Sequence, residues 1–179
     1  MNYSIYAEST PNPGVMKFVA NRMLVDKSIE ITQAEQAKDI SVAKALFNFP
    51  FVKSLYLSSN FISIAKTDNV EWDMIAMQLR NFITDFLNEE GLKNYTENIT
   101  EEEIIKSEVK SEKSTVKIEF TDKEKAIIDL LNEYIKPAVE ADGGAITFNS
   151  YVGDVVTVNL KGACSGCPSA TSTLKGGIE

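Results

Sequence analysis

The two cysteines of this chain are separated by only two residues, and this pair is the feature of the sequence with the clearest chemistry. Cys164 and Cys167 lie in the segment Gly-Ala-Cys-Ser-Gly-Cys-Pro at residues 162–168, and the chain contains no other cysteine and no histidine. The spacing lets both sulfurs face one site, which suits a metal ion, an iron–sulfur cluster or a reversible disulfide. Burial as an inert small hydrophobe explains a lone cysteine better than a pair in a glycine-rich turn. We interpret residues 162–168, called the cysteine loop, as a ligand-binding loop.

The sequence around the cysteine loop predicts a strand before it and a helix after it. Residues 155–160 form an apolar run rich in β-branched side chains. Pro168 suits the first position of a helix, where its missing N–H would have been unpaired in any case. Cys167 would then lie at a helix N-terminus, where the helix dipole favours the thiolate. The neighbouring glycines allow a bulky ligand to approach, and their amides can donate hydrogen bonds to sulfur.

One chain supplies too few ligands to complete a metal site. Structural zinc takes four protein ligands, and iron–sulfur clusters are usually held by four cysteines. Asp142 is a further candidate, but a hard carboxylate is a poor partner for a soft thiolate site. The missing ligands must come from a second copy, from a small thiol or from a client protein. Alternatively, no metal binds and the cysteine pair cycles as a disulfide.

The composition predicts a soluble globular protein. Of the 179 residues, 44% are hydrophobic, and the formal net charge is −8. This acidic charge argues against nucleic acid and against an anionic membrane as partners. No run approaches the ~20 apolar residues of a transmembrane helix, and the first eight residues lack the basic and apolar regions of a signal peptide. A cysteine pair without an export signal fits a reducing compartment, and we predict a cytoplasmic location.

Residues 1–93 are predicted to form a small α+β domain. Strands are expected at residues 4–8, 15–19, 24–31, 51–57 and 61–66, and helices at residues 42–47, capped by Ser41, and 72–86, ending at Gly91. The second of these helices has apolar residues at helical spacing, among them Trp72, Leu79 and Phe86. We expect this stripe to pack in a core rather than to hold a cofactor.

The remaining chain divides into a linker and a second domain. Residues 94–120 are rich in Glu, Lys and Ser, and they are predicted to be a flexible charged linker between domains that fold separately. Residues 121–179 begin with a helix for which Thr121 and Glu124 have capping-box spacing, and Pro137 is expected to kink it or interrupt its hydrogen bonds. The other expected elements are strands at 145–151 and 155–160, the cysteine loop, and a helix from Thr171. The predicted fold class is therefore α+β, with two small domains of mixed helix and strand.

Both predicted domains resemble the Nfu/NifU family of iron–sulfur proteins, and only the linker lies outside the resemblance. The second domain is similar to the NifU C-terminal domain, also called the Nfu domain, through residues 130–144, 162–169 and 173–179. The first domain is similar to the Nfu N-terminal domain through Thr10 to Pro13, Met16 to Phe18, Asn60 to Ile62, Lys66, Glu71 and Trp72. Cys164 and Cys167 match the metal ligands of the family one for one.

The resemblance implies an iron–sulfur cluster scaffold or carrier, not an enzyme. Two Nfu domains are expected to hold one 4Fe–4S cluster between them, with Cys164 and Cys167 of each copy as ligands, which makes a cluster-bridged homodimer. The implied partners are apo iron–sulfur client proteins and other cluster-assembly proteins, with the first domain recognising clients. Only 12 residues follow Cys167, whereas the closing helix of the family normally runs further. We therefore expect the closing helix to be truncated.

Two other functions share the cysteine pair. A thiol–disulfide oxidoreductase also places Cys-x-x-Cys at a helix N-terminus with a lowered pKa. Thioredoxin-type enzymes, however, need a substantial sheet after that motif, and little chain follows Cys167. A zinc-dependent interaction module is the third possibility, and its bound metal would be colourless whereas an iron–sulfur protein is brown.

Overall fold

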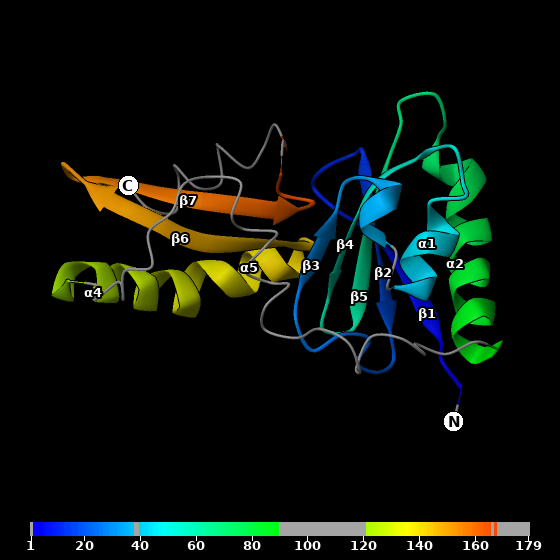
Figure 1. Ribbon diagram of the computed structural model, residues 1–179, viewed down its shortest axis with the longest axis horizontal. Coiled ribbons are helices and arrows are strands. Elements are labelled where there is room, and N and C mark those ends of the chain that lie inside the picture. Colours follow the sequence, from blue (N-terminus) through cyan, green and yellow to red (C-terminus); the bar gives the residue numbers. More distant parts are fainter. Residues whose placement is uncertain (1, 38–39, 90–120, 166, 168–179) are drawn as a thin grey trace.

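The computed structural model describes residues 2–37, 40–89, 121–165 and 167 (Figure 1). These residues form two domains of helices and antiparallel strands, which confirms the predicted α+β class. The first domain contains β1 (Ile5–Ser9), β2 (Val15–Ala20), β3 (Ile29–Ile31), the short 3-10 turn η1 (Ala34–Ala37), α1 (Ser41–Leu46), β4 (Val52–Ser58), β5 (Phe61–Lys66) and α2 (Trp72–Glu89). The second contains α4 (Asp122–Leu130), the π-helical segment η2 (Leu131–Ile135), α5 (Lys136–Ala141), β6 (Gly144–Val152) and β7 (Val155–Gly162).

The first domain is a five-stranded sheet with two helices packed on one face. The strand order is β1-β2-β5-β4-β3, and every neighbouring pair is antiparallel. The helix α2 turns Ile75, Leu79, Ile83 and Leu87 toward the sheet, at the spacing of one helical face. They join buried strand residues such as Phe18 and Ile64 in the larger apolar core. The aromatic and aliphatic stripe predicted from the sequence is thus core.

The opposite face of this sheet carries polar side chains in a row. The strand pairings align Glu8 with Lys17, Lys17 with Ser63, Ser63 with Tyr56, and Tyr56 with Glu30. Paired residues in antiparallel strands share a face, so these five residues cross all five strands side by side. We call them the polar row.

The second domain lays one long helix along a two-stranded hairpin (Figure 1). Thr121 and Glu124 form the predicted capping box at its start. The helix changes to the π-helical segment η2, which ends two residues before Pro137. Because proline lacks the N–H for a regular helical hydrogen bond, the predicted interruption is confirmed. The buried core described here is small and consists of Leu131, Val139 and Ile146 with partly buried neighbours.

Two local predictions in the first domain are wrong. Ser41 does not cap α1, because the N-cap position falls on Ile40 and no side chain caps the helix there. The strand expected at 24–31 is reduced to β3, because the amides of Leu24 and Val25 both donate to the Ser59 carbonyl instead of entering a strand ladder. The first error is a shift of one residue at a helix end. The second arises from hydrogen bonds to a segment that is distant in the sequence.

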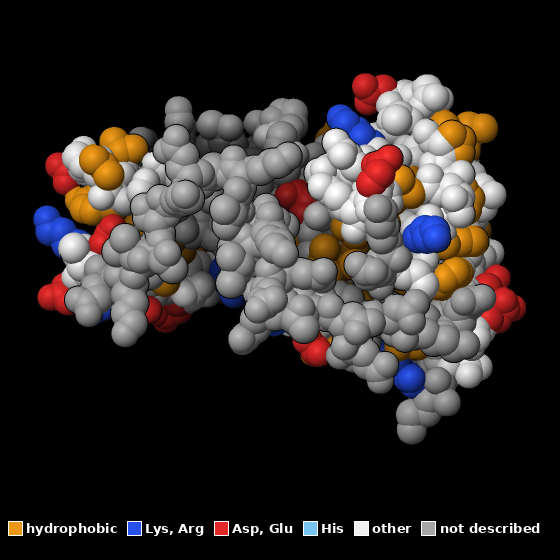
Figure 2. Space-filling model, in the orientation of Figure 1, with side chains coloured by type: hydrophobic (Ala, Val, Ile, Leu, Met, Phe, Trp, Pro, Cys, Tyr) orange, Lys and Arg blue, Asp and Glu red, His pale blue; other side chains and the backbone are white. Residues whose placement is uncertain are grey.

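Other predictions fall outside the described residues. They include the linker at 94–120, the end of α2 at Gly91, the helix expected from Thr171 and its truncation, and the placement of Pro168 at a helix start. Among the residues that the structure places, no helix is long and apolar enough to cross a lipid bilayer. On the face drawn in Figure 2, the described Lys and Arg side chains are scattered between acidic ones and form no continuous basic area.

Candidate functional site

The cysteine loop begins where the hairpin of the second domain opens. Gly144 at the start of β6 pairs with Gly162 at the end of β7, and α5 ends at Ala141, only three residues before Gly144. Gly162 has a φ of 65°, a left-handed conformation that glycine adopts without strain, and it turns the chain out of the strand. The end of α5, the start of β6 and the end of β7 therefore determine where the cysteine loop begins.

Both predicted ligands lie in one tight turn. The Ser165 amide donates to the Gly162 carbonyl at 3.0 Å, and the Cys167 amide donates to the Cys164 carbonyl at 3.5 Å. Cys164 is half-buried and packs against the apolar cluster of the second domain, whereas Cys167 is buried. The structure thus brings together the two residues that the sequence singled out.

Gly144 makes room for the sulfur of Cys164, a role that sequence reasoning missed. A Cβ atom at position 144 would lie 2.6 Å from the Cys164 Sγ and 2.7 Å from the Lys161 carbonyl oxygen. Both distances are shorter than real Cβ contacts, so a side chain at this position would require the cysteine loop or the end of β7 to move. The only sequence signal was the Asp-Gly-Gly segment, which we interpreted as a helix stop.

The Cys164 thiol is held in its neutral form. Burial is the largest of three causes that together raise its pKa to about 11, and the proximity of Asp142 and of Cys167 supplies the other two. Metal binds the thiolate, so binding must release this proton and is favoured as the pH rises. Since the folded state holds the proton more firmly, the thiol stabilises the fold below its ordinary pKa of 9.0, and this contribution is lost as the pH rises toward 11.

The raised pKa predicts slow alkylation of Cys164. At about pH 8, iodoacetamide should modify Cys164 in the folded chain at least about tenfold more slowly than in the denatured chain, because the thiolate is the reactive form. The difference should narrow as the pH rises through the window between 9.0 and about 11. Mass spectrometry of the peptide containing the cysteines, after timed quenching, measures both rates. Equal rates at about pH 8 would contradict the prediction.

The donor set of the site is soft but incomplete. Among the residues that the structure describes, no group of three or more His, Cys, Asp or Glu side chains could hold a metal ion. Asp142 acts on Cys164 through its charge but completes no such group. Two sulfurs in one turn fit half of a four-thiolate iron–sulfur site. The residues present therefore fit a cluster that is shared with another molecule.

The cysteine loop also touches the first domain, which sequence reasoning did not foresee. The Asn12 side chain donates from Nδ2 to the carbonyl of Ala163, the residue before Cys164, at 3.0 Å. The Gly162 amide donates to Glu30 Oε1, also at 3.0 Å. The sequence predicted two domains that fold separately on either side of a linker, and the structure places these domains in contact at the loop.

Comparisons with known families divide the chain at the same place as the fold. A model described as the scaffold protein Nfu/NifU N terminal matches residues 5–90. A model described as the NifU-like domain matches residues 127–179. The two matches cover the elements of both domains and the cysteine loop, except for the part of α4 that precedes residue 127.

The chain is similar to curated proteins along nearly all of its length. It is 33% identical over 178 residues to the NFU1 iron-sulfur cluster scaffold homolog, mitochondrial, of Drosophila grimshawi, with 98% of this chain and 56% of that protein covered. It is 30% identical over 179 residues to NifU-like protein 4, mitochondrial, of Arabidopsis thaliana, of which it covers 60%. A solution NMR structure of a NifU-like protein from Saccharomyces cerevisiae aligns with 48% of this chain and 79% of its own, at 28% identity and a TM-score of 0.44. The chain thus spans between half and two thirds of the length of these curated relatives.

The predicted cytoplasmic location is wrong. The relatives from Drosophila and Arabidopsis are named mitochondrial, which conflicts with it. The prediction was made from a cysteine pair without an export signal, and these features indicate only a reducing compartment. They cannot distinguish the cytosol from another reducing compartment.

The two matched domains, their order along the chain and the cysteine pair in the second of them agree with the resemblance seen in the sequence, and the chain belongs to the Nfu/NifU-like scaffold family.

Proposed function

We propose that this protein is an iron–sulfur cluster scaffold or carrier that binds a 4Fe–4S cluster through Cys164 and Cys167. The observation that carries the proposal is the position of both cysteines in one turn at the open end of the hairpin. Two soft donors at one point suit iron–sulfur chemistry. Relatives of this chain are named iron-sulfur cluster scaffolds, which supports the same function.

The number of ligands leads to a cluster shared by two copies. Each chain brings two thiolates, and a cluster of this type takes four. The simplest arrangement relates two cysteine loops by a two-fold axis, with the same two residues from each copy. The net charge of −8 makes the chains repel one another, so the bonds to iron supply most of the stability of the dimer.

A shared cluster also suits transfer. When a client protein presents its own thiolates, they can replace the pair of one copy and then the pair of the other. The partners that we propose are therefore apo iron–sulfur proteins and other cluster-assembly proteins. No catalytic role is part of this proposal.

The rival function as a thiol–disulfide oxidoreductase is disfavoured by the state of Cys164. The attacking cysteine of such enzymes has a lowered pKa and an accessible sulfur. Here burial raises the pKa of the half-buried Cys164 to about 11. A thiol that keeps its proton at neutral pH is a weak nucleophile.

Anaerobic reconstitution tests the proposal. The full chain is incubated with ferrous iron, sulfide and a reductant, desalted, and analysed for iron, sulfide and zinc, with a visible spectrum and light scattering. We expect a brown dimer with about two irons and two sulfides per chain, and a monomer without cluster. A colourless zinc protein would overturn the proposal. A monomer holding about four irons per chain, without a bound small thiol, would overturn the shared site.

A further inference from the structure

The polar row of the first sheet contacts the second domain where the cysteine loop begins. We call the contacted segments, which are residues 140–143 and the end of β7 at Gly162, the base of the cysteine loop. Lys17, Ser63, Tyr56 and Glu30 stand next to one another on neighbouring strands. Each of the four has a contact with the end of α5, with the turn between α5 and β6, or with the end of β7. No pattern within one strand reveals this row, because each strand contributes a single residue.

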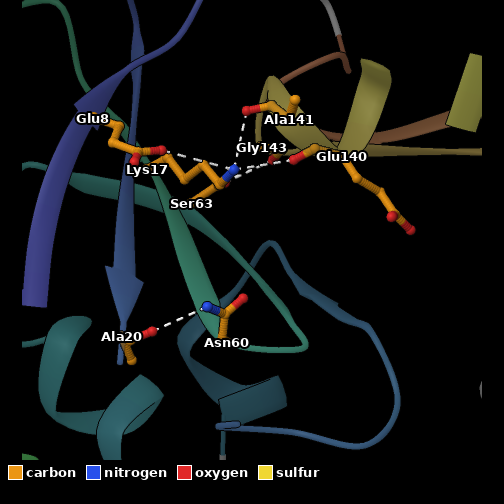
Figure 3. Close-up of polar contacts among 8 residues, drawn as sticks. All are labelled: Glu8, Lys17, Ala20, Asn60, Ser63, Glu140, Ala141 and Gly143. Atoms are coloured by element: carbon orange, nitrogen blue, oxygen red, sulfur yellow. Dashed lines mark hydrogen bonds and ion pairs between the residues drawn. The ribbon is translucent and has the colours of Figure 1, made fainter. Parts of the chain in front are cut away.

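Lys17 is the anchor of this contact. The residue is only 8% exposed, and Nζ donates to the carbonyls of Glu140 at 3.1 Å and Ala141 at 3.0 Å (Figure 3). These carbonyls end α5, where helix carbonyls lack partners within the helix and carry partial negative charge. Phe61 places its ring 4.6 Å from the same nitrogen, and Glu8 lies 3.9 Å away. A buried lysine is costly unless it is paired, and here the second domain provides its hydrogen bonds.

Ser63 contacts the turn that follows α5. Its hydroxyl donates to the Gly143 carbonyl at 2.6 Å, and this bond is buried (Figure 3). A Cβ atom at Gly143 would lie 2.7 Å from the Ser63 Oγ. The absence of a side chain at Gly143 therefore lets the turn reach the sheet.

Tyr56 and Glu30 contact the other side of the loop base. The Gly162 amide donates to Glu30 at 3.0 Å, and a Cβ atom at Gly162 would lie 2.7 Å from Cδ1 of Tyr56. Asn12, from the segment between β1 and β2, donates to the carbonyl of Ala163. The first domain thus binds backbone groups on both sides of the loop base, directly next to Cys164.

We propose that the polar row is a docking site for the base of the cysteine loop of the same chain, with Lys17 as its anchor and Asn12 beside it. The first domain thereby positions the segment that carries Cys164. The contact is reversible, because it consists of polar contacts while each domain keeps its own apolar core. This proposal does not depend on which ligand the cysteines hold.

Amide hydrogen exchange at Gly162 tests the docking in the full chain without iron. This amide is bonded across the interface, so its exchange reports separation of the domains. Lys17→Met and Ser63→Ala each remove hydrogen bonds to the second domain without touching Gly162 or Glu30. We expect exchange at Gly162 to become about tenfold faster or more in Lys17→Met, and several-fold faster in Ser63→Ala, as measured by NMR.

Lys53→Met is the matched control, because Lys53 is an exposed lysine of β4 in the same sheet. It should leave exchange at Gly162 within about twofold of the parent. Protection of the amides in β2 and β5 verifies that the first domain of each variant is folded. If Lys17→Met unfolds this domain, the test rests on Ser63→Ala. Unchanged exchange at Gly162 in the folded variants, or no protection of this amide in the parent, would overturn the proposal. Protection that rises with protein concentration would overturn docking within one chain and assign the docking site to a second copy.

Discussion

Replacing either Cys164 or Cys167 by alanine should abolish both the cluster and the dimer that depends on it. A single thiolate from each chain leaves only two of the four ligands that a shared cluster needs. The described site contains no third metal-binding side chain that could take over. Reconstituted variants should therefore carry almost no iron or sulfide and remain monomeric in light scattering. The fold should persist, since alanine in place of cysteine is a small change in volume.

Ser165→Ala is the matched control for the cysteine variants. Ser165 lies between the two cysteines and is exposed, and its contact within the turn is made by its backbone amide, which alanine retains. This variant should hold as much cluster as the parent and dimerise equally. Cluster retained at the parental level after loss of one cysteine would contradict the assignment of ligands. Equal loss in Ser165→Ala would mean that the shape of the turn, and not its thiols, limits binding.

The parts of the structure that the sequence predicted are those that local patterns determine. The helix α2 shows apolar residues at helical spacing, and Thr121 with Glu124 forms a capping box within one turn. The cysteine pair was identified from residue type and spacing alone, and the resemblance to the Nfu/NifU family agrees with the families found by comparison. In each case the interacting residues lie within a few positions of one another.

The parts that the sequence did not predict depend on contacts between distant residues. Lys17 and Ser63 become neighbours only through the pairing of β2 with β5, and both then meet a turn about eighty residues or more further along the chain. The strand register that creates this neighbourhood cannot be read from any one strand. Gly144 likewise appeared to be only a helix stop, because its contact with Cys164 requires the hairpin to be closed.

The two domains differ in how much apolar core the structure describes. The first buries a large cluster that includes Phe18, Ile64 and Leu79, each with no exposed surface. In the described part of the second, the buried apolar cluster consists of Leu131, Val139 and Ile146, each of which keeps 5–9% of its surface exposed. Small domains have little stability in reserve, so a steric conflict near the cysteine loop should have a large effect.

Gly144→Ala should destabilise the second domain and displace Cys164. The new Cβ atom would lie 2.6 Å from the sulfur and 2.7 Å from the backbone oxygen of Lys161, so the hairpin or the loop must move. Overpacking of this kind costs about 1–3 kcal/mol. In a domain of about sixty residues, a loss of about 2 kcal/mol lowers the Tm by roughly 8–16 °C. Far-UV circular dichroism follows the melting of both domains, whereas the fluorescence of Trp72 reports the first domain alone.

Gly153→Ala separates the steric conflict from the general cost of losing a glycine in this hairpin. Gly153 has a φ of 57°, and nothing lies within 4 Å of a Cβ atom built there. Its replacement should cost only about 1–2 kcal/mol of left-handed backbone strain, leave Cys164 in place and preserve the cluster content of the parent. Gly144 is not in a left-handed conformation, so a lower iron content in Gly144→Ala than in Gly153→Ala comes from the steric conflict at position 144. If Gly144→Ala bound as much iron as Gly153→Ala, the packing of Cys164 against Gly144 would have no part in holding the ligand.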